Sequence, residues 1–153
     1  MHDLSALNPI SGDELIAALN ELLEAERAGA RVTLETANQI KSHELAPLVT
    51  DIQHDEVRWC KMLLGIIGSL GFSPSTATGE FYEKAISIED LKERLLFLNR
   101  GQGWVARRLE KLIPRIQELH IRSQLQAMLD AHVLNIRRVE ERFRPQMIFS
   151  IGN

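Results

Sequence analysis

The chain has 153 residues, enough for one ordinary domain, and its 44% hydrophobic and 25% charged residues are typical of a globular protein. A formal net charge of −3 gives no reason to expect a nucleic acid partner. No apolar run approaches the roughly 20 residues that span a membrane. The first residues lack the basic and apolar regions of a signal peptide. The lone Cys60 cannot form an internal disulfide. We therefore expect a cytoplasmic protein without a membrane or nucleic acid partner.

The first apolar pattern predicts a long helix over residues 12–41, preceded by an N-terminal arm over 1–10. Ser11 precedes Glu14 by three residues, as in a capping box at a helix start. The inward positions alternate at spacings of four and three: Leu15, Leu19, Leu22, Glu26, Gly29 and Thr33. Glu26 therefore stands where the pattern requires an apolar residue. The residues around it are small, so another backbone or a ligand could come close: Ala25, Ala28, Gly29 and Ala30.

The second pattern predicts a helix from near Ser42 to the Gly68–Gly71 region. Pro47 fits its first turn, where the missing N–H costs little. The inward stripe consists of Leu45, Leu48, Ile52, Glu56, Trp59, Leu63 and Ile66. Glu56 is again a carboxylate near the midpoint of an apolar stripe, and Asp55 lies beside it.

The segment 71–87 is predicted to be a long connection, with one helical turn over 80–85. Bundle turns usually need only about 2–8 residues. A connection of this length can travel the length of a bundle, which would make the second and third helices parallel, as in ferritin-like folds. An up-and-down bundle with a decorated loop is the alternative.

The third helix is predicted to start at Ser87, which precedes Asp90 by three residues. Its inward stripe consists of Leu91, Leu95, Leu98, Gln102, Val105, Leu109, Leu112 and Ile116. Gly101 and Gly103 lie in its middle, and each costs about 1 kcal/mol relative to Ala. Such costs require a reason, such as a tight helix contact or space for a bound group. Pro114 is expected to kink the helix near its end.

The fourth helix is predicted over residues 121–143. Its inward stripe consists of Leu125, Leu129, His132, Ile136, Val139 and Phe143. The tail over 145–153 is short and apolar. We expect it to pack onto the body or onto a neighbouring subunit, and we expect a homodimer formed through this tail or another apolar face.

Polar residues at helix midpoints are the main functional feature of the sequence. Helix midpoints lie at one level in a bundle, so four side chains should meet inside: Glu26, Glu56, Gln102 and His132. Buried polar groups are costly unless they are paired or bound to a metal. The sequence therefore predicts one all-α domain over residues 1–153, a four-helix bundle with an interior polar site.

Part of the chain resembles a small family of bacterial ferritin-like proteins of uncharacterised function. The resemblance covers roughly residues 12–143, and it is carried by the segments LNELLEAERAGARVTLE, DEVRWCKMLLGIIGSLGF, GEFYEKA, ERLLFLNRGQGWVARRLEKLIPRI and MLDAHVLNI. The segment LNRGQGWVARRL, with its two glycines, is the most specific of these. The resemblance implies a ferritin-like fold, but it implies no particular activity.

A complete di-iron site is not expected from this sequence. That site takes a Glu from each of two helices and a Glu-x-x-His from each of the other two. Here Trp59 follows Glu56 at the His position, and Leu129 replaces the Glu that would precede His132. One interpretation of the polar layer is therefore a reduced site for one iron, manganese or zinc ion, with Glu26, Glu56 and His132 as ligands and with Asp55 or Asn135 close by.

Two other interpretations of the polar layer remain open. One is a metal-free polar core, in which Arg108 or Arg138 reaches a carboxylate and Gln102 and His132 complete the network. The other is a small-molecule pocket at the level of Gly101 and Gly103. The sequence itself names no substrate or reaction for any of the three.

Overall fold

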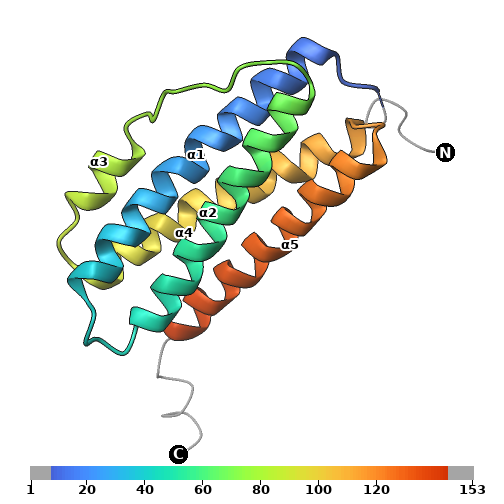
Figure 1. Cartoon of the computed structure of the whole chain (residues 1–153). Helices are drawn as coiled ribbons and strands as arrows, with labels where there is room; N and C mark the ends of the chain where they lie inside the picture. Colours follow the sequence, from blue (N-terminus) through green and yellow to red (C-terminus); the bar gives the residue numbers. More distant parts are fainter. Residues whose placement is uncertain (1–7, 145–153) are drawn as a thin grey trace, which may run out of the picture.

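The computed structural model describes residues 8–144, and four long helices form its body (Figure 1). These are α1 (Gly12–Gln39), α2 (Ala46–Ser69), α4 (Leu91–Leu112) and α5 (Leu119–Arg142). A short helix, α3 (Phe81–Ile86), lies within the long connection, and a 3₁₀ turn over Ile113–Arg115 follows α4. Within residues 8–144 no helix is long and apolar enough to cross a membrane. Most of the predicted N-terminal arm and the whole predicted tail over 145–153 fall outside the described residues.

The two helical hairpins pack side by side, with a crossover between them. α1 packs on α2 and α4, and α5 packs on α4 and α2. The connection after α2 runs back along α1 before α4 begins, so α2 and α4 are parallel (Figure 1). The predicted all-α bundle with a long crossover is therefore confirmed, and the up-and-down alternative is wrong.

The crossover is held to α1 by hydrogen bonds between its backbone and side chains of α1. The Arg27 guanidinium donates to the carbonyl oxygens of Ala77 and Ser75 at 2.9 and 3.0 Å. The Ser75 N–H donates to the Asn20 side chain at 2.7 Å. Because these bonds satisfy backbone groups that would otherwise need water, they fix the path of a connection that has little regular structure.

Buried Arg94 anchors the far end of the crossover. Its guanidinium donates to the carbonyl oxygens of Ile88 and Ile86, and to the side chains of Thr36 and Gln39 on α1. Its four partners come from the crossover and from the end of α1. Arg94 thereby joins the beginning of α4 to α1.

The helix starts follow capping rules, with one correction. Ser11 caps α1 by accepting a hydrogen bond from the Glu14 N–H at 3.2 Å, as predicted. The cap of α4 is Asp90, which accepts from the Glu93 N–H at 2.9 Å. Ser87 was predicted for this role, but its hydroxyl donates to the Lys84 carbonyl and belongs to the end of α3.

Two other boundaries differ from the predicted ones. α2 begins at Ala46 rather than near Ser42, because residues 40–45 form turns in which the Leu45 N–H donates to the His43 ring. α4 stops at Leu112, and Pro114 lies in the 3₁₀ turn that ends it rather than at a kink inside it. Proline has no N–H for the next helical bond, and its ring crowds the preceding turn.

The apolar core is divided into two clusters with a polar layer between them. One cluster includes Leu19, Leu63, Leu109 and Leu125, toward the start of α1. The other includes Val32, Ile52, Leu95, Leu98 and Val139, toward its end. Each of the four long helices has a buried polar residue between the two clusters: Glu26, Glu56, Gln102 and His132.

Gly101 is explained by the packing of α3 on α4. The ring of Phe81 stacks on Phe97 with a centroid separation of 5.0 Å. A Cβ atom at Gly101 would lie 2.9 Å from the Phe81 ring, whereas one at Gly103 would meet only the guanidinium end of Arg107, at 3.2 Å. The tight contact expected from the glycine pair is therefore present at Gly101.

The two glycines should respond differently to substitution by alanine. Gly103→Ala should stabilise the protein by up to about 1 kcal/mol, since alanine favours the helix and the Arg107 side chain can move. Gly101→Ala should destabilise it by about 1–3 kcal/mol, because the Phe81 ring must shift and its stack on Phe97 is disturbed. Urea unfolding of both variants measures the difference. Equal stability of the two variants would show that α3 does not pack tightly on α4.

Candidate metal centre

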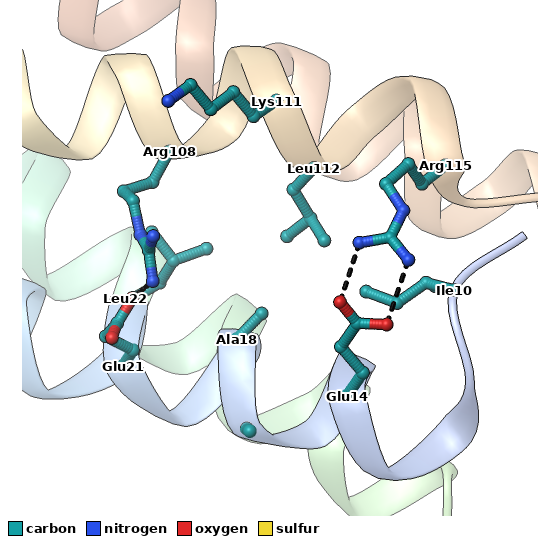
Figure 2. A pocket seen from close by; sticks show the side chains of 10 residues that line it. Ile10, Glu14, Ala18, Glu21, Leu22, Arg108, Lys111, Leu112 and Arg115 are labelled. Atoms are coloured by element: carbon teal, nitrogen blue, oxygen red, sulfur yellow. Dashed lines mark hydrogen bonds and ion pairs between the residues drawn. The ribbon is translucent and has the colours of Figure 1, made fainter. Parts of the chain in front are cut away.

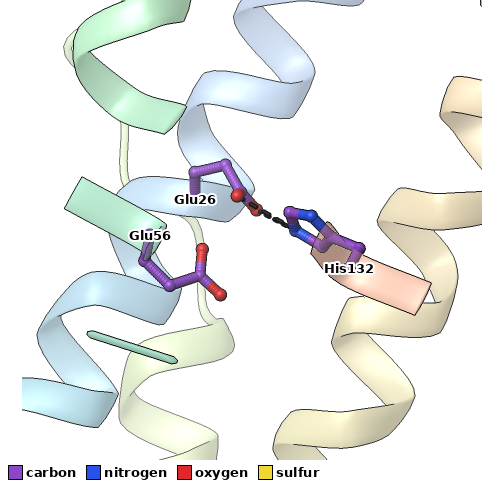
Figure 3. Close-up of side chains that lie close together, drawn as sticks. All are labelled: Glu26, Glu56 and His132. Carbon is purple, nitrogen blue, oxygen red and sulfur yellow. Dashed lines mark hydrogen bonds and ion pairs between the residues drawn. The ribbon is translucent and has the colours of Figure 1, made fainter. Parts of the chain in front are cut away.

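Three buried side chains from three helices converge at the polar layer. Glu26 comes from α1, Glu56 from α2 and His132 from α5 (Figure 3). One oxygen of each carboxylate and one ring nitrogen of the histidine all lie within 4.8 Å of one another. The exposed fractions of the three residues are 1%, 3% and 2%, so water contributes little to their solvation.

The imidazole of His132 is oriented by a backbone hydrogen bond. Its Nδ1 lies 2.8 Å from the Met128 carbonyl oxygen, which can only accept, so Nδ1 carries a proton and donates it. Its Nε2 faces Glu26, at 3.0 Å from Oε1 and 3.2 Å from Oε2. A neutral imidazole in this tautomer points a lone pair at the carboxylate layer. This is also the arrangement by which a metal-binding histidine is commonly oriented.

Burial makes both carboxylates hard to ionise. It raises the pKa of Glu26 to about 8, and the charge of nearby Asp55 adds to the rise. Burial, followed by the charge of Glu26, raises the pKa of Glu56 well above its usual range. A divalent cation between these groups would reverse this preference, because it favours the ionised form of each ligand.

Glu56 lies in a space that a side chain at position 29 would fill. A Cβ atom at Gly29 would be 3.0 Å from both Cδ and Oε1 of Glu56. The sequence indicated a close approach beside the small residues of α1, and the group that approaches is this carboxylate. Its Oε2 is buried and accepts no hydrogen bond within residues 8–144.

Asp55 and Asn135 lie next to the three converging residues but are turned toward each other. The Asn135 side chain donates to Asp55 Oδ2 at 2.9 Å. Asn135 is buried and Asp55 is half-buried. The pair links α2 to α5 beside the layer, and neither residue belongs to the three-residue cluster.

The predicted arginine partners of the central carboxylates lie elsewhere. Arg108 pairs with the exposed Glu21, as Figure 2 shows, and Arg138 pairs with Asp51 at 2.9 Å. The prediction that either arginine reaches the layer is therefore wrong. Each arginine directly precedes a buried residue in the sequence, and its own side chain lies toward the solvent side of the helix.

Gln102 enters the layer from α4 and faces a pocket. It is 4% exposed, and its Nε2 has no hydrogen-bond partner within the described residues. A pocket of about 440 Å³ is lined by Gln102, by Glu26 and Glu56, and by residues of α3 and α4. The sequence indicated space at the glycine pair, and the structure adds that this space extends to the central carboxylates.

Apolar residues occupy the positions that would complete a two-metal centre. Trp59, three residues after Glu56, is buried, and Leu129, three before His132, is half-buried. The inward stripe predicted for α5 is partly wrong, because the helix turns Met128 and Asn135 rather than Leu129 and Ile136 fully into the core. Asn135 was expected near the site but not in this stripe. The donor set of two carboxylates and one imidazole is sufficient for one ion.

The fold is similar to that of a solved protein, described as a ferritin-like, diiron-carboxylate protein from Bacillus anthracis str. Ames. The similarity has a TM-score of 0.75, covers 88% of this chain and 100% of the other, and comes with 22% sequence identity. It establishes the ferritin-like fold. No curated protein matches the sequence.

A family model described as a domain of unknown function (DUF6306) matches residues 13–141. The matched part contains all four helices of the bundle almost completely, together with the polar layer and the crossover. The chain therefore belongs to the DUF6306 family.

Proposed function

We propose that the protein binds one divalent metal ion, iron, manganese or zinc, through Glu26, Glu56 and His132. The observation that carries this proposal is the convergence of three buried ligand atoms within 4.8 Å of one another. Two carboxylates and an imidazole suit these metals and leave coordination positions open for water or a substrate. A bound ion would supply Lewis acid chemistry or, for iron or manganese, redox chemistry.

Features of the surrounding residues support the proposal. The Met128 carbonyl holds His132 so that Nε2 faces the carboxylates, and Gly29 leaves room for Glu56. Within residues 8–144 no Lys or Arg forms an ion pair with Glu26 or Glu56. Two buried carboxylates without a cation are costly when ionised, and a divalent ion offsets that cost.

A metal-free polar core is the second candidate, and the Glu26–His132 contact favours it. A protonated Glu26 could donate to Nε2 of His132, at 3.2 Å, and leave both groups neutral. This arrangement leaves Glu56 Oε2 without a partner. The layer would then serve only to fix the register of the bundle.

Metal uptake separates the two candidates. Chelator-stripped protein titrated with Zn²⁺, Mn²⁺ or Fe²⁺ should take up about one ion per chain and melt at a higher temperature. Glu56→Gln keeps the size of the side chain and should weaken binding by at least about 100-fold, since it removes a ligand. Glu110→Gln, an exposed glutamate of α4, is the matched control and should bind as the wild type does. Calorimetry and elemental analysis measure both effects; no stoichiometric uptake would leave the metal-free core.

The stability of the metal-free protein should fall as pH rises. The pKa of Glu26 is about 8 in the folded protein against an ordinary value of 4.5. The contribution of Glu26 to the free energy of unfolding is therefore fully present below pH 4.5 and is lost as pH rises through about 8. The raised pKa of Glu56 acts in the same direction. Bound metal should reverse the trend, because protons compete with the ion. Urea unfolding across this pH range measures whether the free energy of unfolding falls or rises. In the metal-free protein, Glu26→Gln should make that free energy depend less on pH. A stability that increases over the same range without metal would contradict the prediction.

A further inference from the structure

The pocket beside the polar layer has the size and lining of a small-molecule site. Its volume is about 440 Å³, within the usual range of such sites of roughly 300–1,000 Å³. Residues of α1, α2, α3 and α4 line it. It connects exposed residues of α4 with the buried carboxylates.

The floor of the pocket carries a buried donor and a buried acceptor without partners. Gln102 Nε2 and Glu56 Oε2 are both buried and form no hydrogen bond within residues 8–144. Both residues line the pocket. Leaving such groups unpaired costs free energy, and a ligand that pairs with them recovers it. A hydroxyl group suits this floor because it can accept from an amide and donate to a carboxyl oxygen.

The walls of the pocket are aromatic and aliphatic. Phe81 and Phe97, which are stacked on each other, contribute to the lining together with Leu98 and Val105. Trp104, 38% exposed, also lines the pocket. Such a surface favours an apolar, preferably aromatic, ligand body.

The mouth of the pocket carries two arginines without carboxylate partners. Arg100 and Arg107 are exposed lining residues, and within residues 8–144 neither forms an ion pair. A neighbouring groove between α1 and the end of α4 differs, since its Arg108 and Arg115 are paired with glutamates of α1 (Figure 2). Two unpaired guanidinium groups at one opening are suited to binding a carboxylate.

We propose that this pocket binds a small amphipathic carboxylate with a hydroxyl group at its far end. The carboxylate is held by Arg100 and Arg107, the apolar body lies against the aromatic walls, and the hydroxyl pairs with Gln102 and Glu56. The proposal goes beyond metal binding, because its mouth, walls and amide donor are not metal ligands. It is therefore tested on chelator-stripped protein, where its failure and the failure of the metal centre are separate results.

Calorimetric titration of the full chain with 3-(4-hydroxyphenyl)propionate tests the ligand class. This probe should bind saturably. 3-Phenylpropionate, which lacks the far hydroxyl, and 4-(3-hydroxypropyl)phenol, which lacks the carboxylate, should each bind about tenfold more weakly. Saturable binding of the full probe with weaker binding of both analogues supports the proposal. No saturable binding, or equal binding of the three compounds, overturns it.

Substitutions of lining residues test whether the probe binds in this pocket. Arg100→Gln with Arg107→Gln should weaken binding of the probe about tenfold and leave the uncharged analogue unaffected. Lys111→Gln with Arg115→Gln removes the same number of charges from the neighbouring groove and should leave binding of the probe unchanged. Equal effects of the two pairs would show that only general charge attraction is involved, and would overturn the proposal.

Gln102→Leu separates a ligand-binding role from a structural one. It removes an unpaired buried amide, so the protein without ligand should melt at a higher temperature. The same change should weaken binding of the hydroxylated probe about tenfold and leave 3-phenylpropionate unaffected. A lower melting temperature together with unchanged binding of the probe would mean that Gln102 only supports the fold, contrary to the proposal.

Discussion

The burial of two carboxyl groups beside an imidazole is the constraint around which this bundle is organised. Glu26 and Glu56 interrupt the apolar stripes of α1 and α2 at the level where His132 enters from α5. Ionised carboxylates at such depth are costly, and burial accordingly raises the pKa of both. A purely structural core could use leucine at these places, as the two flanking clusters do. The polar layer therefore costs stability relative to an apolar core, as binding sites commonly do.

The crossover determines where this layer is covered and where it is open. It carries α3 onto α4, where Phe81 lies against Gly101. Arg27 of α1 binds carbonyl groups in the first part of the connection. Arg94 of α4 binds carbonyl groups at its end and two side chains of α1. α3 therefore bridges α1 and α4 and adds Phe81 to the aromatic wall of the pocket, whose other rings, Phe97 and Trp104, belong to α4. An up-and-down connection would leave that wall without Phe81.

Much of the fold follows from the sequence because apolar periodicity depends only on local helix geometry. The midpoint residues Glu26, Glu56 and His132 were identifiable since each replaces an apolar residue in a regular stripe. The position of Arg108 was not predictable, because its partner Glu21 lies on another helix and the choice between two carboxylates depends on the relative rotation of α1 and α4. Buried Arg94 was missed for a similar reason, as its partners come from the crossover and the end of α1.

The fourth helix shows the limit of pattern reasoning most directly. Its sequence allows two nearby stripes, one through Leu129 and Ile136 and one through Met128 and Asn135. The structure turns the second stripe fully inward. A rotation of this size changes little for leucine or methionine, which can pack in either place. It matters at Asn135, whose amide meets Asp55 and thereby keeps that carboxylate from joining the central cluster.

The difference from the two-metal pattern also explains why the proposed one-metal site and the pocket lie together. In the two-metal pattern every helix contributes a carboxylate, whereas here α5 contributes only His132 and α4 contributes Gln102. Trp59 is buried on α2 and offers no metal ligand, and the Gln102 amide is a weaker cation ligand than a carboxylate of the same size. The side of the layer that faces α4 is therefore the side on which the pocket reaches Glu26 and Glu56. A ligand in the pocket would therefore lie beside Glu26 and Glu56, two of the residues that would hold the ion.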